Sequence, residues 1–153
     1  HKKRIIPAIL LVLVQMLVYA VQDSEKYNYS LKKWREEGIS RYNIKVSYNA
    51  FSPLSGIWDI EVIDGKPVSV KFKGKSGQQY LKTAGRFTME SLYVIAENSL
   101  TTQADAPMKT ETEYDSVTGF IKSVSRISNP SFRGGVKMDA GYSIRVLEFH
   151  PLK

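Results

Sequence analysis

YNIKVSYNAFSPLSGIWDIEVIDGKPVSVKF, residues 42–72, decides the fold of this chain. Apolar and polar side chains alternate over 42–50, 58–62 and 67–72, the period of strands with one buried face. Asp64-Gly65 separates the last two runs, and both residues tolerate the positive φ of a tight primed turn. The stretch therefore predicts a three-stranded antiparallel meander with an apolar face that other elements must cover.

Two helical patterns supply that cover. The first spans 24–37 after the N-cap pair Asp23-Ser24 and ends before Gly38, a typical C′ residue. The second spans 89–100 after the N-cap Thr88. The apolar stripes are Tyr27, Leu31 and Trp34 in the first helix and Met89, Leu92, Tyr93, Ala96 and Leu100 in the second.

Further strands are predicted at 108–114, 120–127 and 142–149, with a turn at 115–119 and a long loop at 129–140. Alternation in 120–127 is imperfect, which indicates a bulge or an edge position. The order predicts an α+β fold of two αβββ units in sequence. We expect one mainly antiparallel sheet of about six strands, with two helices covering one face.

The N-terminus has the pattern of an export signal. Basic residues 2–4 precede an apolar run over 5–20, and Val18 and Ala20 suit a signal-peptidase site. We expect residues 1–20 to be a signal peptide cleaved near Ala20, leaving 21–153 as a single periplasmic or secreted α+β domain without a stable membrane span. The alternative is retention by an uncleaved N-terminal anchor.

Charge and cysteine content exclude several classes of function. The chain has 22 Lys and Arg against 15 Asp and Glu, a net charge of +7, and losing residues 2–4 would leave +4. Lys45, Asp59 and Lys71 alternate in sign across neighbouring strands, which favours ion pairs on a solvated face over a nucleic-acid surface. The chain has no cysteine, so disulfides and thiolate sites are excluded.

Several short motifs, in their order and spacing, resemble family 6174 of the domains of unknown function, which are small bacterial exported proteins and lipoproteins. The motifs are Trp34 and Gly38, Tyr42, Val62 to Val68, Thr88 to Leu92, Tyr114-Asp115, Gly119-Phe120, Asp139 and Tyr142. The resemblance implies export and an α+β fold, and it implies no reaction. Members often have a cysteine pair where Tyr48 and Ala50 stand here, so a role of that pair cannot apply.

The basic, glycine-rich segment 74–87 is a candidate anion-binding loop through Lys75, Lys82 and Arg86. It is not a phosphate loop, because the first glycine of that motif would have to stand at Ser69. The alternative interpretation is a solvated loop.

Few residues suit catalysis. His150 is the only histidine after signal removal, and we expect it to be solvated. Glu111 and Glu113 share a strand face without other metal ligands at suitable spacing. Asp115 and Asp139 form the better acidic pair, although Asp115 also suits turn capping. No cofactor is predicted.

Two functions follow. The first is a non-enzymatic extracytoplasmic module, expected to be a monomer, that binds an envelope protein or a small ligand. The second is a hydrolase-like enzyme using Asp115, Asp139 and Tyr142. Convergence of these side chains in one polar pocket would favour the enzyme, and separate turn-capping roles would favour the module.

Overall fold

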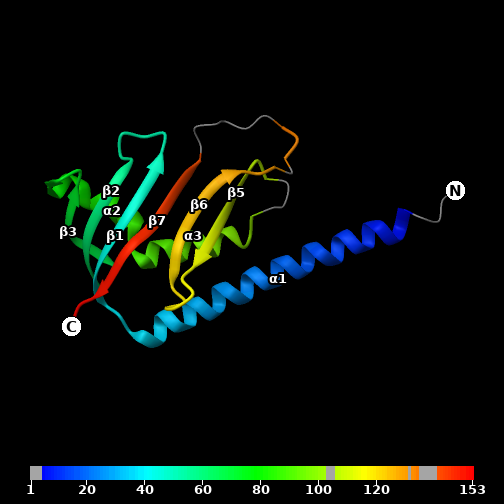
Figure 1. Cartoon of the computed structure of the whole chain (residues 1–153), viewed down its shortest axis with the longest axis horizontal. Helices are drawn as coiled ribbons and strands as arrows, with labels where there is room; N and C mark the ends of the chain where they lie inside the picture. The colour runs from blue at the N-terminus through cyan, green and yellow to red at the C-terminus, as the bar shows by residue number, and fades with distance from the viewer. Residues whose placement is uncertain (1–4, 103–105, 131, 135–140) are drawn as a thin grey trace.

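The structure is a computed structural model that describes residues 5–102, 106–130, 132–134 and 141–153 (Figure 1). Its helices are α1 (Ile5–Glu37), α2 (Leu81–Ala84) and α3 (Met89–Ser99), with the 3-10 turns η1 (Gln78–Tyr80) and η2 (Gly85–Phe87) on either side of α2. Its strands are β1 (Arg41–Ala50), β2 (Gly56–Ile63), β3 (Lys66–Phe72), β4 (Lys75–Ser76), β5 (Met108–Tyr114), β6 (Ile121–Ser128) and β7 (Tyr142–Pro151).

All strands join one antiparallel sheet in the order β4-β3-β2-β1-β7-β6-β5. The predicted α+β class and antiparallel sheet are confirmed. About six strands were predicted, and the described part of the chain has seven, because β4 adds one. Lys73 and Gly74 have φ of 49° and 77°, so they form a tight turn that returns the chain against β3. The two predicted αβββ units are matched only in part, since β4, α2 and the 3-10 turns separate them.

The predicted hairpin at Asp64-Gly65 is confirmed. Asp64 and Gly65 have φ of 49° and 74°, as a primed turn between β2 and β3 requires. The bulge predicted within 120–127 is also present: where β5 pairs with β6 the register shifts between Glu113 and Tyr114, which leaves Lys122 of β6 as the extra residue. An edge position for 120–127 is wrong, because β6 lies between β7 and β5.

The core lies between one face of the sheet and the helices. Trp34 of α1 packs edge-on against Tyr42, Phe120 and Phe149, which come from three separate parts of the sheet layer. The fully buried strand residues on this face include Tyr42, Ile44, Val46, Trp58, Ile60, Val62, Val124 and Ile144. The burial of Tyr27 and Trp34 confirms the stripe predicted for the first helix.

The other face of the sheet is open and charged. Arg41 pairs with Glu61 at 3.1 Å and Lys45 pairs with Glu148 at 2.6 Å, both across neighbouring strands. Cross-strand ion pairs were predicted for this face. Lys45 lies opposite Asp59 in the β1–β2 register, but its ion pair is with Glu148 of β7.

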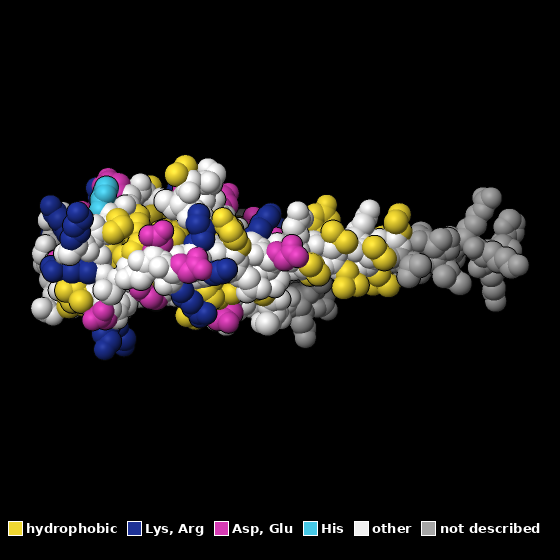
Figure 2. All heavy atoms as spheres, turned by 90° about the horizontal axis from the view of Figure 1, so that it is seen from below, with side chains coloured by type: hydrophobic (Ala, Val, Ile, Leu, Met, Phe, Trp, Pro, Cys, Tyr) yellow, Lys and Arg dark blue, Asp and Glu magenta, His cyan; other side chains and the backbone are white. Residues whose placement is uncertain are grey.

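α1 is longer than the predicted helix 24–37. It begins at Ile5 and continues through Asp23-Ser24, because the apolar run over 5–20 is itself helical and nothing interrupts the backbone hydrogen bonds before that pair. Figure 1 shows this part of α1 projecting beyond the sheet, and Figure 2 shows hydrophobic side chains on all visible sides of it. Exposed apolar residues here are Leu11, Val12, Leu13, Val14, Leu17, Val18, Tyr19 and Val21. Among the described helices, none is both long and apolar enough to span a membrane.

Candidate binding groove

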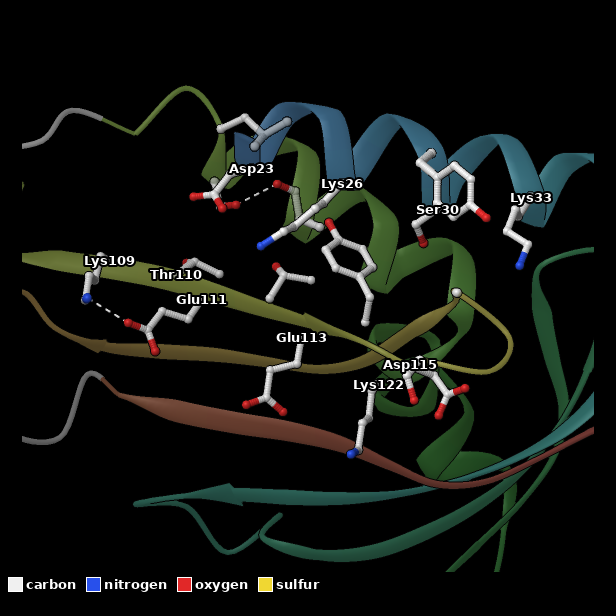
Figure 3. Close-up of a pocket in the computed structure, with 18 residues that line it drawn as sticks. Asp23, Lys26, Ser30, Lys33, Lys109, Thr110, Glu111, Glu113, Asp115 and Lys122 are labelled. Carbon is white, nitrogen blue, oxygen red and sulfur yellow. Dashed lines mark hydrogen bonds and ion pairs between the residues drawn. The ribbon is translucent and has the colours of Figure 1, made fainter. Parts of the chain in front are cut away.

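A large concavity lies between α1 and the edge strand β5 (Figure 3). We call it the α1–β5 groove; its volume is about 1040 Å³. Its lining comes from α1 (Asp23, Lys26, Tyr29, Ser30, Lys33), α3 and its C-cap (Ala96, Ser99, Leu100), β5 and the following turn (Lys109 to Ser116, Gly119) and β6 (Lys122).

The α1 wall is one face of the helix. Asp23, Lys26, Ser30 and Lys33 follow one another at steps of three and four residues, so their side chains lie on one side of α1. Figure 3 shows Lys26 directed toward β5 and Lys33 toward the turn that follows β5. Buried Ser30 is hydrogen-bonded to the hydroxyl of Tyr93 on α3 at 2.7 Å, which fixes this wall against the core.

Aromatic side chains lie beneath the groove. Tyr27 and Tyr93 meet edge-on with ring centroids 6.3 Å apart. Burial raises the pKa of half-buried Tyr114 to about 12, with further contributions from Tyr93, Tyr27 and the Asp23 carboxylate. The groove lining therefore combines half-buried Tyr114 with charged side chains on both walls.

The acidic side chains of the β5 wall already have partners. Lys109 pairs with Glu111 at 2.6 Å, and Glu113 accepts a hydrogen bond from the Ser123 hydroxyl at 3.0 Å. Glu113 therefore links β5 to β6, whereas the exposed Lys109–Glu111 pair lies within β5.

Asp115 caps its own turn. Its Oδ1 accepts hydrogen bonds from the N–H groups of Thr118 (2.7 Å) and Val117 (3.0 Å) and from the Thr118 hydroxyl (3.1 Å). These hydrogen bonds hold the pKa of the Asp115 carboxyl below its ordinary value. The bond from the Thr118 N–H contributes most, and the nearby charge of Lys122 makes a smaller contribution. Turn capping, one of the two predicted roles, is confirmed.

Gly119 lets the two walls meet at this end. Its φ is +78°, and a Cβ there would lie 3.0 Å from Cδ of Lys33. A side chain would therefore meet both backbone strain and the Lys33 stem. The Lys33 amino group lies 5.5 Å from the ring centroid of Tyr29, over its face.

The backbone of β5 is open along its outer edge. Pro107 O accepts from Asn129 N–H at 3.0 Å, so the hydrogen-bonded pairs that follow are Lys109 with Ile127 and Glu111 with Ser125. The N–H and C=O groups of residues 108, 110 and 112 consequently point away from β6. Within the described chain, none of these outward groups has a hydrogen-bond partner.

A family model for a family of unknown function, DUF6174, matches residues 26–128. The chain belongs to the DUF6174 family. The match includes β5, β6 and α1 from Lys26 onward, so it contains nearly all of the groove. No curated protein and no solved structure matches the chain.

Within this DUF6174 protein, the predicted acidic site is not assembled from the described residues. Asp115 lies at the end of the groove where β5 turns into β6, whereas Tyr142 pairs with Arg126 toward the other end of β6. Asp139 lies outside the described residues. The hydrolase hypothesis stays a prediction. Glu111 and Glu113 do line one strand face as predicted, and no cluster of three potential metal ligands occurs in the described part of the chain.

The predicted basic contacts are also divided. Arg86 stacks over Tyr48 at 5.7 Å from the ring centroid, and Tyr48 lies 6.3 Å from Tyr142, so Arg86 and Tyr142 belong to one cluster. Lys75 and Lys82 are exposed on β4 and α2, at the sheet edge opposite β5. His150 is exposed, 3.5 Å from Glu148.

The sequence interpretation missed the α1 wall of the groove. Lys26 and Lys33 form no ion pair with any described residue. A polar stripe beside the apolar stripe was the available signal, but such a stripe is also typical of any solvated helix face. Only the sheet order shows that this stripe faces an open strand edge.

Proposed function

We propose that this DUF6174 protein is an exported, non-enzymatic binding module that holds a segment of an envelope protein in the α1–β5 groove. The observation that carries the proposal is the groove itself, in which a helix wall faces an unpaired strand edge over an aromatic floor. Binding sites are typically concave, with a few polar groups over an apolar base.

The engaged carboxylates of the groove support binding over hydrolysis. Glu111 is paired with Lys109, Glu113 with Ser123, and Asp115 with its own turn. A general acid or base needs a carboxyl group that can reach a substrate and exchange its proton. Asp115 has a lowered pKa, the opposite of the shift that would favour a general acid near neutral pH.

The N-terminal sequence supports export. Basic residues 2–4 and the apolar run 5–20 form a signal pattern, and the side chains over 11–15 and 17–21 are exposed. Cleavage near Ala20 would remove this apolar extension and keep the α1 wall, which begins at Asp23. N-terminal sequencing of protein recovered from intact cells tests this step: a mature chain beginning near Val21 supports export, and an intact N-terminus in the cytoplasmic fraction contradicts it.

Photocrosslinking in the source cells tests the binding site. Benzoylphenylalanine is incorporated at position 26 or 110, inside the groove, and at position 71 on the open sheet face as the control. We expect crosslinks to a discrete protein from positions 26 and 110, and none of that species from 71. Identical products from all three positions, or none from the groove, would contradict the proposal.

A further inference from the structure

We infer that the occupant of the α1–β5 groove is an extended, acidic peptide segment of a partner protein, which adds to β5 as an eighth strand. This inference rests on the proposed binding function and specifies its ligand chemistry. Strand addition supplies main-chain hydrogen bonds from an exposed edge, while side-chain surroundings supply specificity.

The backbone of β5 is suited to this role. Residues 108, 110 and 112 present outward N–H and C=O groups that have no partner among the described residues. β5 contains no proline, and its register shift is confined to the last step, between Glu113 and Tyr114. An edge with these properties pairs readily with another extended chain.

The charge on the α1 wall selects acidic side chains. Alternate residues of an added strand would face α1, where Lys26 points toward β5 and Lys33 toward the turn at its end (Figure 3). These two lysines form no ion pair with a described residue. Of the acids opposite them, Glu111 is paired with Lys109, whereas Glu113 and Asp115 accept hydrogen bonds from uncharged groups and keep their negative charge. On the α1 wall itself, Lys26 and Lys33 stand beside a single acid, Asp23, and this local excess of positive charge is the basis for an acidic occupant.

A single strand fits this edge better than a second copy of the chain. α1 runs beside β5, so pairing two β5 edges would bring two copies of α1 to the same junction. An isolated extended segment has no helix of its own to place there.

The test uses the full chain in a mild non-ionic detergent, which keeps the exposed apolar residues of α1 in solution. The probe is a fluorescent, acetylated peptide of alternating Glu and Thr, about as long as β5, and binding is measured by anisotropy. The same peptide with Lys in place of Glu is the charge control. Two further peptides are methylated on backbone nitrogens, one at every Glu and the other at every Thr. Strand addition predicts that one methylated series binds and the other does not, because alternate N–H groups point to opposite edges.

Matched variants separate backbone recognition from charge. Thr110→Pro removes an outward N–H and should weaken binding by about tenfold, whereas Thr110→Val should not. Lys26→Glu combined with Lys33→Glu should weaken binding by about tenfold or more, and Lys71→Glu, on the far half of the sheet, by much less. Circular dichroism and urea midpoints confirm that each variant is folded.

The outcomes separate this inference from the proposed function. Binding of the acidic peptide that survives Thr110→Pro and both methylation patterns would overturn strand addition and leave a charged binding groove. Equal binding of the basic peptide would overturn the acidic preference. A dimer that forms with concentration and is broken by Thr110→Pro would assign the edge to a second copy instead. Absence of peptide binding, together with groove crosslinks in cells, would overturn the inference alone; absence of both would overturn the proposed function as well.

Discussion

At one edge of the sheet β4 has only two residues, while at the other edge β5 runs for seven residues, from Met108 to Tyr114. The β4 side carries several features that prevent pairing with another chain. β3 contains Pro67, its register with β2 shifts between Glu61 and Val62, and α2 and η1 pack against it. β5 has no proline and no register shift along its first six residues, and α3 packs against it.

This contrast indicates that the two edges meet different requirements. A sheet edge with no binding role can cause unwanted pairing with other chains, so it is typically shortened, twisted or covered, as β3 and β4 are. β5 is left open beside a helix face that carries Lys26 and Lys33. The asymmetry is the physical basis for placing binding at β5.

The closed edge depends on its aromatic packing, and Trp58→Ala should have the largest effect. Trp58 is fully buried, stacks on Phe72 with ring centroids 4.1 Å apart and meets Tyr80 edge-on at 6.0 Å. Removing it should lower the free energy of unfolding by about 3–5 kcal/mol, measured by urea denaturation. If the β5 amides lost protection from hydrogen exchange before those of β3 in this variant, the assignment of Trp58 to the closed edge would fail.

The register of β5 can be tested with two neighbouring prolines. Lys109→Pro removes an N–H that bonds to β6, whereas Thr110→Pro removes one that points outward. Lys109→Pro should therefore cost about 1–3 kcal/mol more in unfolding free energy than Thr110→Pro, because the carbonyl of Ile127 loses its donor. Equal losses would mean that the outer edge of β5 is not free.

Two turn glycines, one near each edge, allow a smaller comparison. Gly74 and Gly119 have φ of +77° and +78°, so alanine at either should cost about 1–2 kcal/mol. A Cβ at Gly74 would contact nothing within 4 Å, while one at Gly119 would press on Lys33. Only Gly119→Ala should therefore also reduce peptide binding. Reduced binding in both variants would indicate a general loss of structure instead.

The smallest expected effect is the pH dependence contributed by Asp115. Its folded-state pKa lies below the ordinary value, so its stabilisation is present above the unfolded pKa and is lost as pH falls through the folded pKa. Near neutral pH, the free energy of unfolding of the wild type should exceed that of Asp115→Ala by less than about 1 kcal/mol, because the carboxylate is solvent-exposed. The difference should shrink between about pH 5 and pH 2. A difference that stays constant over this range would mean that the charge of Asp115 has no role in the turn.

Much of the fold could be predicted from the sequence, since its signals are local. Alternation identified β1, β2 and β3, and Asp64-Gly65 identified the turn between the last two. Helix α3 was predicted within one residue of its observed end. β4 could not be found, because a strand of two residues has no period, and the Lys73-Gly74 turn lacks the usual Asn or Asp.

The candidate site was less accessible, since it depends on contacts between distant parts of the chain. Asp115 was predicted both as a turn cap and as a site residue, and its hydrogen bonds confirm the cap. To predict the groove, one must know that β7 pairs with β1, because this pairing leaves β5 at the edge of the sheet. Local alternation does not report strand order, and the imperfect pattern of β6 indicated an edge one strand away from the true one.

Hydrogen exchange at individual β5 amides, measured by NMR with and without the acidic peptide, tests the open edge most directly. In the free chain the amides of Lys109 and Glu111 should be protected and those of Thr110 and Thr112 should exchange quickly, because only the first pair bonds to β6. The peptide should slow exchange at Thr110 and Thr112. Equal protection of all four amides in the free chain, or no change at Thr110 and Thr112 with saturating peptide, would contradict the account.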